Sequence, residues 1–261
     1  MTILDRLAEH AKERVCEAKK ATPLSAIRRQ AENLPRGTFA FETALKNPGI
    51  SFICECKKAS PSKGLIAPDF PYARIAMDYE AAGADCISVL TEPKWFLGSD
   101  EYLREIANTV SIPCLRKDFT VDEYMIYEAK LLGASAVLLI CSILSETQIK
   151  EYIAVCDKLG LSALVEAHDE QEVNAAIRSG ARIIGVNNRN LKDFSVDLGT
   201  ASRLRDMIPK DAVYVAESGV QSAEDVRALS LAGADAILMG EVLMRAENKG
   251  LQLQAFREAA R

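Results

Sequence analysis

Histidine is scarce in this chain, which limits the metal chemistry it can support. The only two histidines are His10 and His168, so a three-histidine metal site is excluded. The closely spaced Cys54 and Cys56 have no second cysteine pair to complete a zinc site. We therefore expect no bound metal.

Long hydrophobic runs and an excess of positive charge are also absent. The longest apolar stretch, 134–144, is interrupted by serines and is too short to cross a bilayer. The charged first fifteen residues have no apolar signal-peptide core. With 32 Lys+Arg against 37 Asp+Glu, the formal net charge is −5. The chain therefore lacks the excess of positive charge that would attract nucleic acid or an anionic membrane. We expect no nucleic-acid partner and no membrane partner.

The seven cysteines do not form an obvious disulfide framework. Their number is odd, and most lie inside apolar runs, where a reduced thiol behaves as a small hydrophobic side chain. This usage predicts a reducing, cytoplasmic location. The chain has 261 residues, 49 % of them apolar and 26 % charged, so it is long enough to bury a core as two small domains or one large barrel.

An internal repeat distinguishes between these two architectures. Four segments share one pattern, in which a helical run is followed by Gly-Ala and then by a short apolar run: 81–90, 131–140, 178–187 and 231–240, with 158–167 as a variant. A glycine at each junction suits the left-handed position that closes a helix. The apolar runs are continuous rather than alternating, which is typical of parallel strands covered on both faces.

Three further strands, at 51–57, 112–118 and 212–218, complete the pattern. Strand starts then fall near residues 52, 86, 112, 135, 161, 182, 212 and 235, with helical periodicity in segments such as 72–83, 122–133 and 223–233. This spacing predicts a single (β/α)₈ TIM barrel of the α/β class. A doubly wound sheet is the alternative, but it rarely repeats so evenly.

The first part of the chain lies outside this count. We expect one domain over 1–261, with residues 1–48 as an N-terminal helical extension. Residues 4–21 form one amphipathic helical pattern and 23–32 a second, while 39–45 is a weaker helix or a turn. This extension either caps the bottom or side of the barrel or covers the substrate mouth.

Active sites in such barrels lie at the carboxyl ends of the strands, and polar side chains gather at those ends here. The groups are Glu55-Cys56-Lys57-Lys58, Arg116-Lys117-Asp118, Glu166, Asn187-Asn188-Arg189 and Glu217-Ser218-Gly219. A lone lysine after a strand is usually a solvated loop residue. Glu55 and Lys57, however, are two apart in a strand and share one face, so they point into the barrel. Buried charges are costly unless they are paired, so this cluster predicts a functional site.

A phosphate site is predicted after the last two strands. Ser218-Gly219 follows the seventh strand and Gly240-Glu241 follows the eighth at a helix start. Backbone N–H groups at these positions suit a phosphate dianion, and these loops are the common phosphate position in such barrels. The small-residue loop 60–64 could close over the same ligand.

Five motifs resemble one specific family. They are Glu55-x-Lys57-x-x-Ser60-Pro61-Ser62, Leu115-Arg116-Lys117-Asp118-Phe119, Leu164-Val165-Glu166, Gly185-Val186-Asn187-Asn188-Arg189-Asn190-Leu191 and Ala216-Glu217-Ser218-Gly219. In this order and spacing they resemble indole-3-glycerol-phosphate synthases, from the amino-terminal helix to Met244. The resemblance implies a (β/α)₈ barrel with an amino-terminal extension and favours the interpretation in which the extension covers the mouth.

The resemblance also implies a reaction and the residues that perform it. Members close the indole ring of 1-(2-carboxyphenylamino)-1-deoxyribulose 5-phosphate, releasing indole-3-glycerol phosphate, carbon dioxide and water, without a metal or an organic cofactor. By match to the family's motifs, Lys117 is the general acid and Glu166 the acid/base group, Lys57 holds the substrate carboxylate and assists dehydration, and Glu55 orients Lys57. Substrate binding is implied for Asn187, Arg189, Glu217 and Phe96, and phosphate binding for Ser60, Ser218, Gly219, Gly240 and Glu241.

Two positions depart from the family's pattern. Glu241 stands where a serine is frequent, and an acidic side chain repels phosphate, so we expect only its backbone N–H to face the ligand. Leu97 stands where a second small residue is frequent, in the loop that carries Phe96. Neither change removes a catalytic group.

Two alternatives remain distinguishable. A phosphoribosylanthranilate isomerase relies on a cysteine and an aspartate, whereas this chain offers Glu55, Lys57, Lys117 and Glu166. The second alternative is a barrel that has lost activity and serves as a scaffold. Such a barrel is expected to lack at least one of the charged strand-end residues, and none is missing here. We expect a phosphorylated small-molecule substrate and, without a dimerisation helix or an apolar exposed stripe, a monomer.

Overall fold

Eight parallel strands close into a barrel, as the repeat predicts. The computed structural model describes residues 2–190 and 194–260, which leaves Leu191 of the fourth motif outside the described residues. The barrel strands are β1 (Ser51–Cys56), β4 (Cys86–Leu90), β5 (Cys114–Lys117), β6 (Ala136–Ile140), β7 (Ser162–Ala167), β8 (Ile183–Asn187), β9 (Val213–Glu217) and β10 (Ala236–Met239). Each strand pairs with its neighbours in parallel, and β1 pairs with both β4 and β10, which closes the ring. The predicted (β/α)₈ TIM barrel is confirmed.

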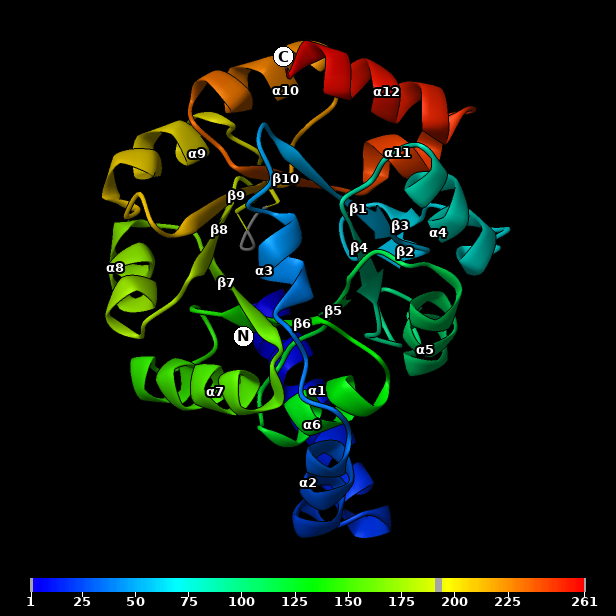
Figure 1. Ribbon diagram of the computed structural model, residues 1–261, viewed down its shortest axis with the longest axis vertical. Helices are drawn as coiled ribbons and strands as arrows, with labels where there is room; N and C mark the ends of the chain where they lie inside the picture. The colour runs from blue at the N-terminus through cyan, green and yellow to red at the C-terminus, as the bar shows by residue number, and fades with distance from the viewer. Residues whose placement is uncertain (1, 191–193, 261) are drawn as a thin grey trace.

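Helices surround the barrel (Figure 1); those from α4 to α10 connect successive strands, and α11 and α12 follow the last strand. They are α4 (Tyr72–Ala81), α5 (Asp100–Thr109), α6 (Tyr124–Leu131), α7 (Glu146–Leu159), α8 (Glu170–Arg178), α9 (Gly199–Leu204) with the 3₁₀ turn η1 (Arg205–Met207), α10 (Ala223–Leu231), α11 (Glu241–Arg245) and α12 (Lys249–Ala259). The glycines at the predicted helix-to-strand junctions all have positive φ: Gly83, Gly133, Gly160, Gly180 and Gly233. Each junction therefore reverses the chain where an L-residue is strained.

The strand side chains divide into two hydrophobic layers, which explains why the strands are continuously apolar. On β1, Ile53 points into the barrel interior, whereas Cys54 and Cys56 pack outward among the helices. Successive strand residues point to opposite faces, so a strand buried on both sides needs apolar residues at every position. The predicted outward placement of the two cysteines is confirmed, and all seven cysteines are free thiols.

The N-terminal extension contains three helices, α1 (Ile3–Ala21), α2 (Leu24–Asn33) and α3 (Ala40–Ala44). The short helix α3 lies across the centre of the barrel in Figure 1, at the amino ends of the strands. There the backbone N–H of Glu42 donates to Ser162 Oγ (3.1 Å), and Ser51 Oγ donates to the Ala44 carbonyl (3.3 Å); Ser162 and Ser51 are the first residues of β7 and β1. Thus α3 closes the bottom of the barrel.

Helix α1 lies at the opposite end. It begins with a capping box between Thr2 and Asp5 and reaches the carboxyl ends of the strands through Arg14, which pairs with Asp118 directly after β5. The two interpretations of the extension therefore apply to different helices, because α1 covers the mouth while α3 covers the bottom. In the described part of the chain, no helix is both long and apolar enough to cross a membrane.

Candidate active site

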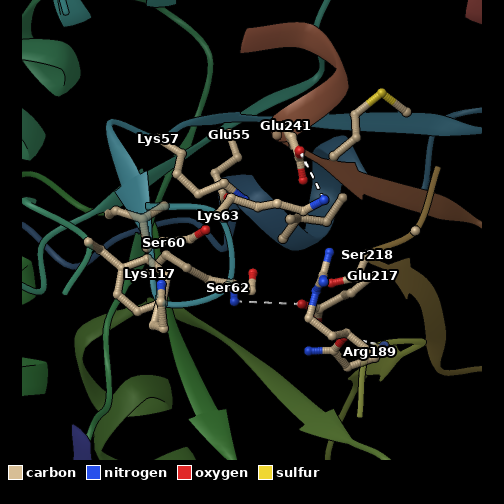
Figure 2. Close-up of a pocket in the computed structure, with 18 of the residues that line it drawn as sticks. Glu55, Lys57, Ser60, Ser62, Lys63, Lys117, Arg189, Glu217, Ser218 and Glu241 are labelled. Atoms are coloured by element: carbon tan, nitrogen blue, oxygen red, sulfur yellow. Dashed lines mark hydrogen bonds and ion pairs between the residues drawn. The ribbon is translucent and has the colours of Figure 1, made fainter. Parts of the chain in front are cut away.

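A cavity of about 750 Å³ opens at the carboxyl ends of the strands. Every site residue predicted from the sequence lines it: Glu55, Lys57, Ser60, Phe96, Lys117, Glu166, Asn187, Arg189, Glu217, Ser218, Gly219, Gly240 and Glu241. Figure 2 shows the charged side chains converging on the space from different strands. One wall is apolar, because Ile3, Leu4 and Leu7 of α1 join the lining. The cavity thus combines a charged floor with a wall suited to a flat hydrophobic group.

The predicted pair on β1 is formed. Lys57 Nζ lies 2.7 Å from Glu55 Oε1, and Ser88 Oγ donates to Glu55 Oε2 (3.4 Å). Burial raises the pKa of Glu55, but attraction to Lys57 and Lys117 outweighs it and lowers the pKa overall. A β-carbon at Gly240 would lie 2.6 Å from Glu55 Oε1 and 3.2 Å from Lys57 Nζ, so glycine there leaves room for the pair.

Lys117 is the central cation of the site. Its Nζ lies 3.5 Å from Glu166 Oε2 and 3.8 Å from Glu217 Oε2. Burial alone lowers the pKa of the ammonium, but the surrounding carboxylates Glu166, Glu217 and Glu55 outweigh burial and raise it. Lys117 is therefore held as a charged ammonium facing the cavity, ready to stabilise negative charge on a bound ligand.

Glu166 and Glu217 differ in charge although both carboxyl groups are buried. Asn187 Nδ2 donates to Glu166 Oε1 (3.1 Å), and this amide, Lys117 and His168 overcome burial and lower the pKa of Glu166. Burial and the nearby charge of Glu166 raise the pKa of Glu217 to about 8 despite the attraction of Lys117. Glu217 Oε1 has no hydrogen-bond partner among the described residues. At neutral pH these two neighbouring carboxyl groups therefore favour different forms, Glu166 ionised and Glu217 protonated, a division typical of proton-transfer sites.

This division predicts a pH-dependent stability difference for Glu217→Gln. The raised pKa means that the stability associated with Glu217 is fully present below its ordinary pKa of 4.5 and is lost as the pH rises through about 8. Glutamine imitates the protonated form and does not titrate. Urea unfolding measures the free energy of unfolding at pH 6 and at pH 9. The decrease from pH 6 to pH 9 is expected to be smaller in the variant than in the wild type. Parallel losses in both proteins would show that Glu217 is already ionised at pH 6.

Two positioning residues were missed by the sequence reasoning. Asn188 is buried, and its Nδ2 donates to the carbonyls of Glu217 (3.1 Å) and Ser218 (3.2 Å), which holds the loop after β9. Gly185 of β8 faces Glu217, and a β-carbon there would collide with the Glu217 carboxyl group. In the sequence both residues belong to the fourth family motif, 185–191, but the motif alone did not indicate that they position Glu217 and the loop after β9.

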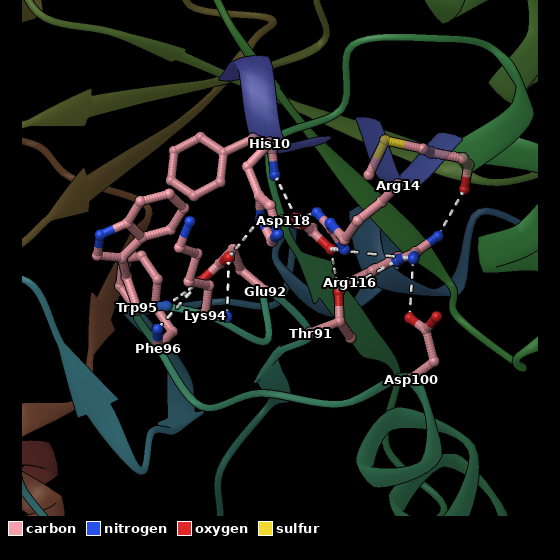
Figure 3. A network of polar contacts seen from close by, with 12 residues as sticks. His10, Arg14, Thr91, Glu92, Lys94, Trp95, Phe96, Asp100, Arg116 and Asp118 are labelled. Carbon is pink, nitrogen blue, oxygen red and sulfur yellow. Dashed lines mark hydrogen bonds and ion pairs between the residues drawn. The ribbon is translucent and has the colours of Figure 1, made fainter. Parts of the chain in front are cut away.

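Helix α1 is tied to the residue next to Lys117 (Figure 3). Arg14 donates two hydrogen bonds to Asp118, from Nη2 to Oδ1 (2.6 Å) and from Nη1 to Oδ2 (3.1 Å). Thr91 Oγ1 donates a third, to Asp118 Oδ2 (2.6 Å). Bidentate Arg–carboxylate pairs are strong and directional. Thus the extension holds the end of β5, where Lys117 is placed.

A second contact of α1 shapes the loop that carries Phe96. The buried Glu92 accepts backbone N–H bonds from Lys94 (3.0 Å), Trp95 (2.7 Å) and Phe96 (3.0 Å), and His10 Nδ1 lies 3.2 Å from its Oε1 (Figure 3). The Phe96 ring lies 6.1 Å from that of Phe119. The Glu92 carboxylate therefore holds the loop in a turn, and Phe96 and Phe119 both line the cavity.

Arg116 does not join the charged cluster, although the sequence places it beside Lys117. It points outward between the barrel and the helices, where its Nη2 lies 2.8 Å from Asp100 Oδ1 and 2.7 Å from Glu128 Oε2. Alternation along β5 explains this: because Lys117 faces the cavity, Arg116 must face the other way.

The phosphate candidates form the other side of the cavity. Ser218 and Gly219 both have positive φ, 65° and 96°, so the chain turns sharply after β9. Glu241 lines the cavity, and its Oε1 lies 3.1 Å from Arg245 Nε and 3.6 Å from Lys63 Nζ. The acidic side chain is thereby paired with two cations, which reduces its repulsion of an anion.

Comparison with known proteins shows to which family the chain is similar. The family model for indole-3-glycerol phosphate synthase matches residues 4–256. A protein of that name from Ruminiclostridium cellulolyticum is 56 % identical over 99 % of this chain and 100 % of its own length, and another from Lacticaseibacillus paracasei is 50 % identical with the same coverage.

Solved structures show the same fold at low sequence identity. The 3-hexulose-6-phosphate synthase of Salmonella typhimurium has a TM-score of 0.66 and 15 % identity, covering 81 % of this chain and 98 % of its own. This likeness concerns the barrel alone. The match to the family model over residues 4–256 and the identities of 50 % and 56 % show that the chain belongs to the indole-3-glycerol phosphate synthases, the carboxy-lyase family that closes the indole ring in tryptophan biosynthesis.

Proposed function

We propose that the cavity at the carboxyl ends of the strands is where this chain closes the indole ring, with its own buried charges performing the proton transfers. The observation that carries this proposal is the convergence of two lysines and three buried carboxyl groups on one cavity with an apolar wall. The wall accommodates the anilino ring, and the charged floor faces the ribulose carbonyl and the ring carboxylate.

The first step forms a carbon–carbon bond. When the ring carbon attacks the ribulose carbonyl, the carbonyl electron pair moves to oxygen, and Lys117 stabilises this charge and then protonates the oxygen. Its position among carboxylates keeps it protonated and ready to act. Lys57 holds the substrate carboxylate, and Glu55 orients Lys57 through the 2.7 Å ion pair.

The later steps release carbon dioxide and water. Glu166 is the second proton-transfer group, held by Asn187 Nδ2 at 3.1 Å and facing Lys117. Asn187 and Arg189 bind the sugar hydroxyls and support the carboxylate network, and Glu217 lies at the ring end of the pocket. Phe96 contacts the aromatic ring.

The phosphate binds between the loops after β9 and β10. Ser60, Ser218, Gly219, Gly240 and Glu241 surround it, Glu241 through its backbone N–H. The N-terminus of α11 at Gly240 has no side-chain cap, which leaves its first N–H groups to a ligand. Lys63 and Arg245 add positive charge beside this position.

The direct test of this function is turnover of the purified protein. Addition of 1-(2-carboxyphenylamino)-1-deoxyribulose 5-phosphate is expected to produce the fluorescence increase of indole-3-glycerol phosphate, with carbon dioxide released in equal amount. The rate is expected to survive prolonged treatment with a strong chelator. A protein that binds the substrate without turnover would instead be a scaffold.

Replacing Gly219 tests the phosphate site. The φ of Gly219 is 96°, and a β-carbon there would lie 2.7 Å from Val196 Cγ1 and 2.8 Å from Leu198 Cδ2. Gly219→Val therefore displaces the loop and is expected to raise KM more than it lowers kcat, because phosphate binding is used in the ground state and the transition state alike. Steady-state kinetics and sulfate competition measure this. An unchanged KM would place the phosphate elsewhere.

We also propose that the chain acts as a monomer in the cytoplasm. Among the residues that the structure describes, the exposed large hydrophobic side chains are distributed over several elements, such as Leu34 after α2, Leu231 on α10 and Leu251 on α12, rather than gathered along one helix. Light scattering of the purified protein is expected to give the mass of a single chain.

A further inference from the structure

His168 occupies a position that the mechanism above leaves unused. It follows β7 directly, and its imidazole lies between two carboxylates from different elements. On the barrel side, Nε2 lies 3.3 Å from Glu166 Oε1, and on the outer side, Nδ1 lies 3.0 Å from Glu172 Oε2 of α8. Only 16 % of the His168 side chain is exposed.

The outer carboxylate is itself held in place. Glu172 Oε2 accepts the backbone N–H of His168 (2.8 Å), and Ser142 Oγ, after β6, donates to Glu172 Oε1 (2.5 Å). The backbone N–H of Glu172 donates to the helix-capping Asp169 (2.9 Å). Nδ1 of the imidazole therefore faces a positioned hydrogen-bond acceptor, and Nε2 faces the Glu166 carboxylate at ion-pair distance, which favours the form with both ring nitrogens protonated.

The charges around the imidazole agree with this form. Burial lowers the pKa of His168, but Glu166 and Glu172 outweigh it and raise the pKa to about 10. The other titratable groups near these two carboxylates are the thiol of Cys141 after β6, which Glu172, Glu166 and Asp169 influence, and the Lys117 ammonium on the far side of Glu166. Burial raises the pKa of the Cys141 thiol, so the thiol stays neutral.

Glu166 therefore receives contacts from two sides. Lys117 Nζ faces Oε2 from the cavity at 3.5 Å, while Asn187 Nδ2 and His168 Nε2 approach Oε1 from behind. We propose that His168 is a positioning residue, held by its contact with Glu172, that fixes the Glu166 carboxylate toward Lys117. Its imidazolium places a positive charge next to Glu166 on the side away from the substrate. This inference rests on the proton-transfer role proposed above for Glu166.

Without the imidazolium, Glu166 keeps its contacts with Asn187 and Lys117 but loses the positive charge beside Oε1. An opposite charge within about 4–6 Å favours the ionised form, so its loss moves the titration of Glu166 to higher pH. A residue that acts through another affects the rate less than the proton-transfer group itself, whose loss typically costs about 10²–10⁴. We expect His168→Gln to lower kcat about tenfold to a hundredfold, with KM within about twofold.

The kinetic test compares this variant in two backgrounds. In the wild-type background, His168→Gln is expected to lower kcat and move the acidic limb of the kcat–pH profile upward, and Glu172→Gln to shift the same limb by less. In a Glu166→Gln background, His168→Gln is expected to have no further effect, because contacting residues that act as one unit are not additive. Glu170→Gln removes a charge from the same turn of α8, where it is exposed, and is expected to leave the profile unchanged.

An NMR titration tests the imidazole without relying on turnover. Because the chain has only two histidines, a His10→Gln sample assigns the His168 ring signals. The ring is expected to remain protonated above pH 8 in the wild type and to titrate at lower pH in Glu172→Gln. Titration of wild-type His168 near its ordinary pKa of 6.5 would overturn the proposal.

The kinetic results can also overturn it. An unshifted pH profile in a folded His168→Gln protein, or an equal loss of kcat in both backgrounds, would show that His168 does not act through Glu166. Failure of the proposed function gives a different result, because the wild-type protein would then release no indole-3-glycerol phosphate while the imidazole titration remained as expected.

Discussion

Lys117→Ala is expected to lower kcat by at least about two orders of magnitude while substrate binding survives. Lys117 Nζ lies within 3.8 Å of the carboxyl groups of Glu166 and Glu217 and faces the cavity, so its ammonium is in place before the substrate arrives. The charge that it stabilises appears only as the ring closes. An interaction made mainly in the transition state affects kcat rather than KM. Steady-state kinetics and the affinity for a product analogue measure the two effects separately.

Lys57→Ala is the matched control for this variant. Lys57 also carries an ammonium in the same cavity, but it pairs with Glu55 at 2.7 Å on a different strand. If its main role is to hold the substrate carboxylate, its loss is expected to raise KM more than Lys117→Ala does. The opposite pattern, near-normal kcat with a raised KM in Lys117→Ala, would make Lys117 a binding residue and Lys57 the acid.

The strand positions could be predicted because several independent patterns agree. Continuous apolar runs, junction glycines and even spacing all point to the same eight strands. Alternation also placed Glu55 and Lys57 on the interior face and the cysteines outside, as the 2.7 Å ion pair and the outer hydrophobic cluster confirm. These features depend on local geometry, which a single sequence records.

Contacts between distant segments could not be predicted in the same way. The amphipathic pattern of α1 shows that one face is buried, but not which end of the barrel buries it. The Arg14–Asp118 pair joins residues 104 positions apart, and nothing in either segment indicates the other. The extension therefore had two possible locations until the structure showed that α1 and α3 occupy opposite ends.

Alternation could have identified two further features. Since Lys117 faces the cavity, the same rule places Arg116 outside. His168 is two residues after Glu166, and Glu172 is four residues after His168, spacings that bring side chains to one face of a strand and one turn of a helix. From the sequence, His168 served only to exclude a metal site.

Glu166→Gln is expected to lower kcat by about 10²–10⁴ and to leave substrate binding largely intact. Both carboxylate oxygens of Glu166 face donors or cations, with Asn187 Nδ2 at 3.1 Å from Oε1 and Lys117 Nζ at 3.5 Å from Oε2. Glutamine keeps the shape but supplies only one acceptor oxygen, so its amide group must face one of these donors, and it cannot exchange a proton.

The step affected by Glu166→Gln distinguishes its role from that of Lys117. Glu166 is proposed to act after the carbon–carbon bond has formed, so rapid quenching of the variant is expected to trap ring-closed intermediates that Lys117→Ala does not accumulate. The kcat–pH profile is expected to lose its acidic limb. Glu217→Gln is the matched control, because Glu217 has a raised pKa and an amide resembles its protonated form, so this variant is expected to retain more activity. Slowed ring closure in Glu166→Gln, without trapped intermediates, would place Glu166 in the first step beside Lys117.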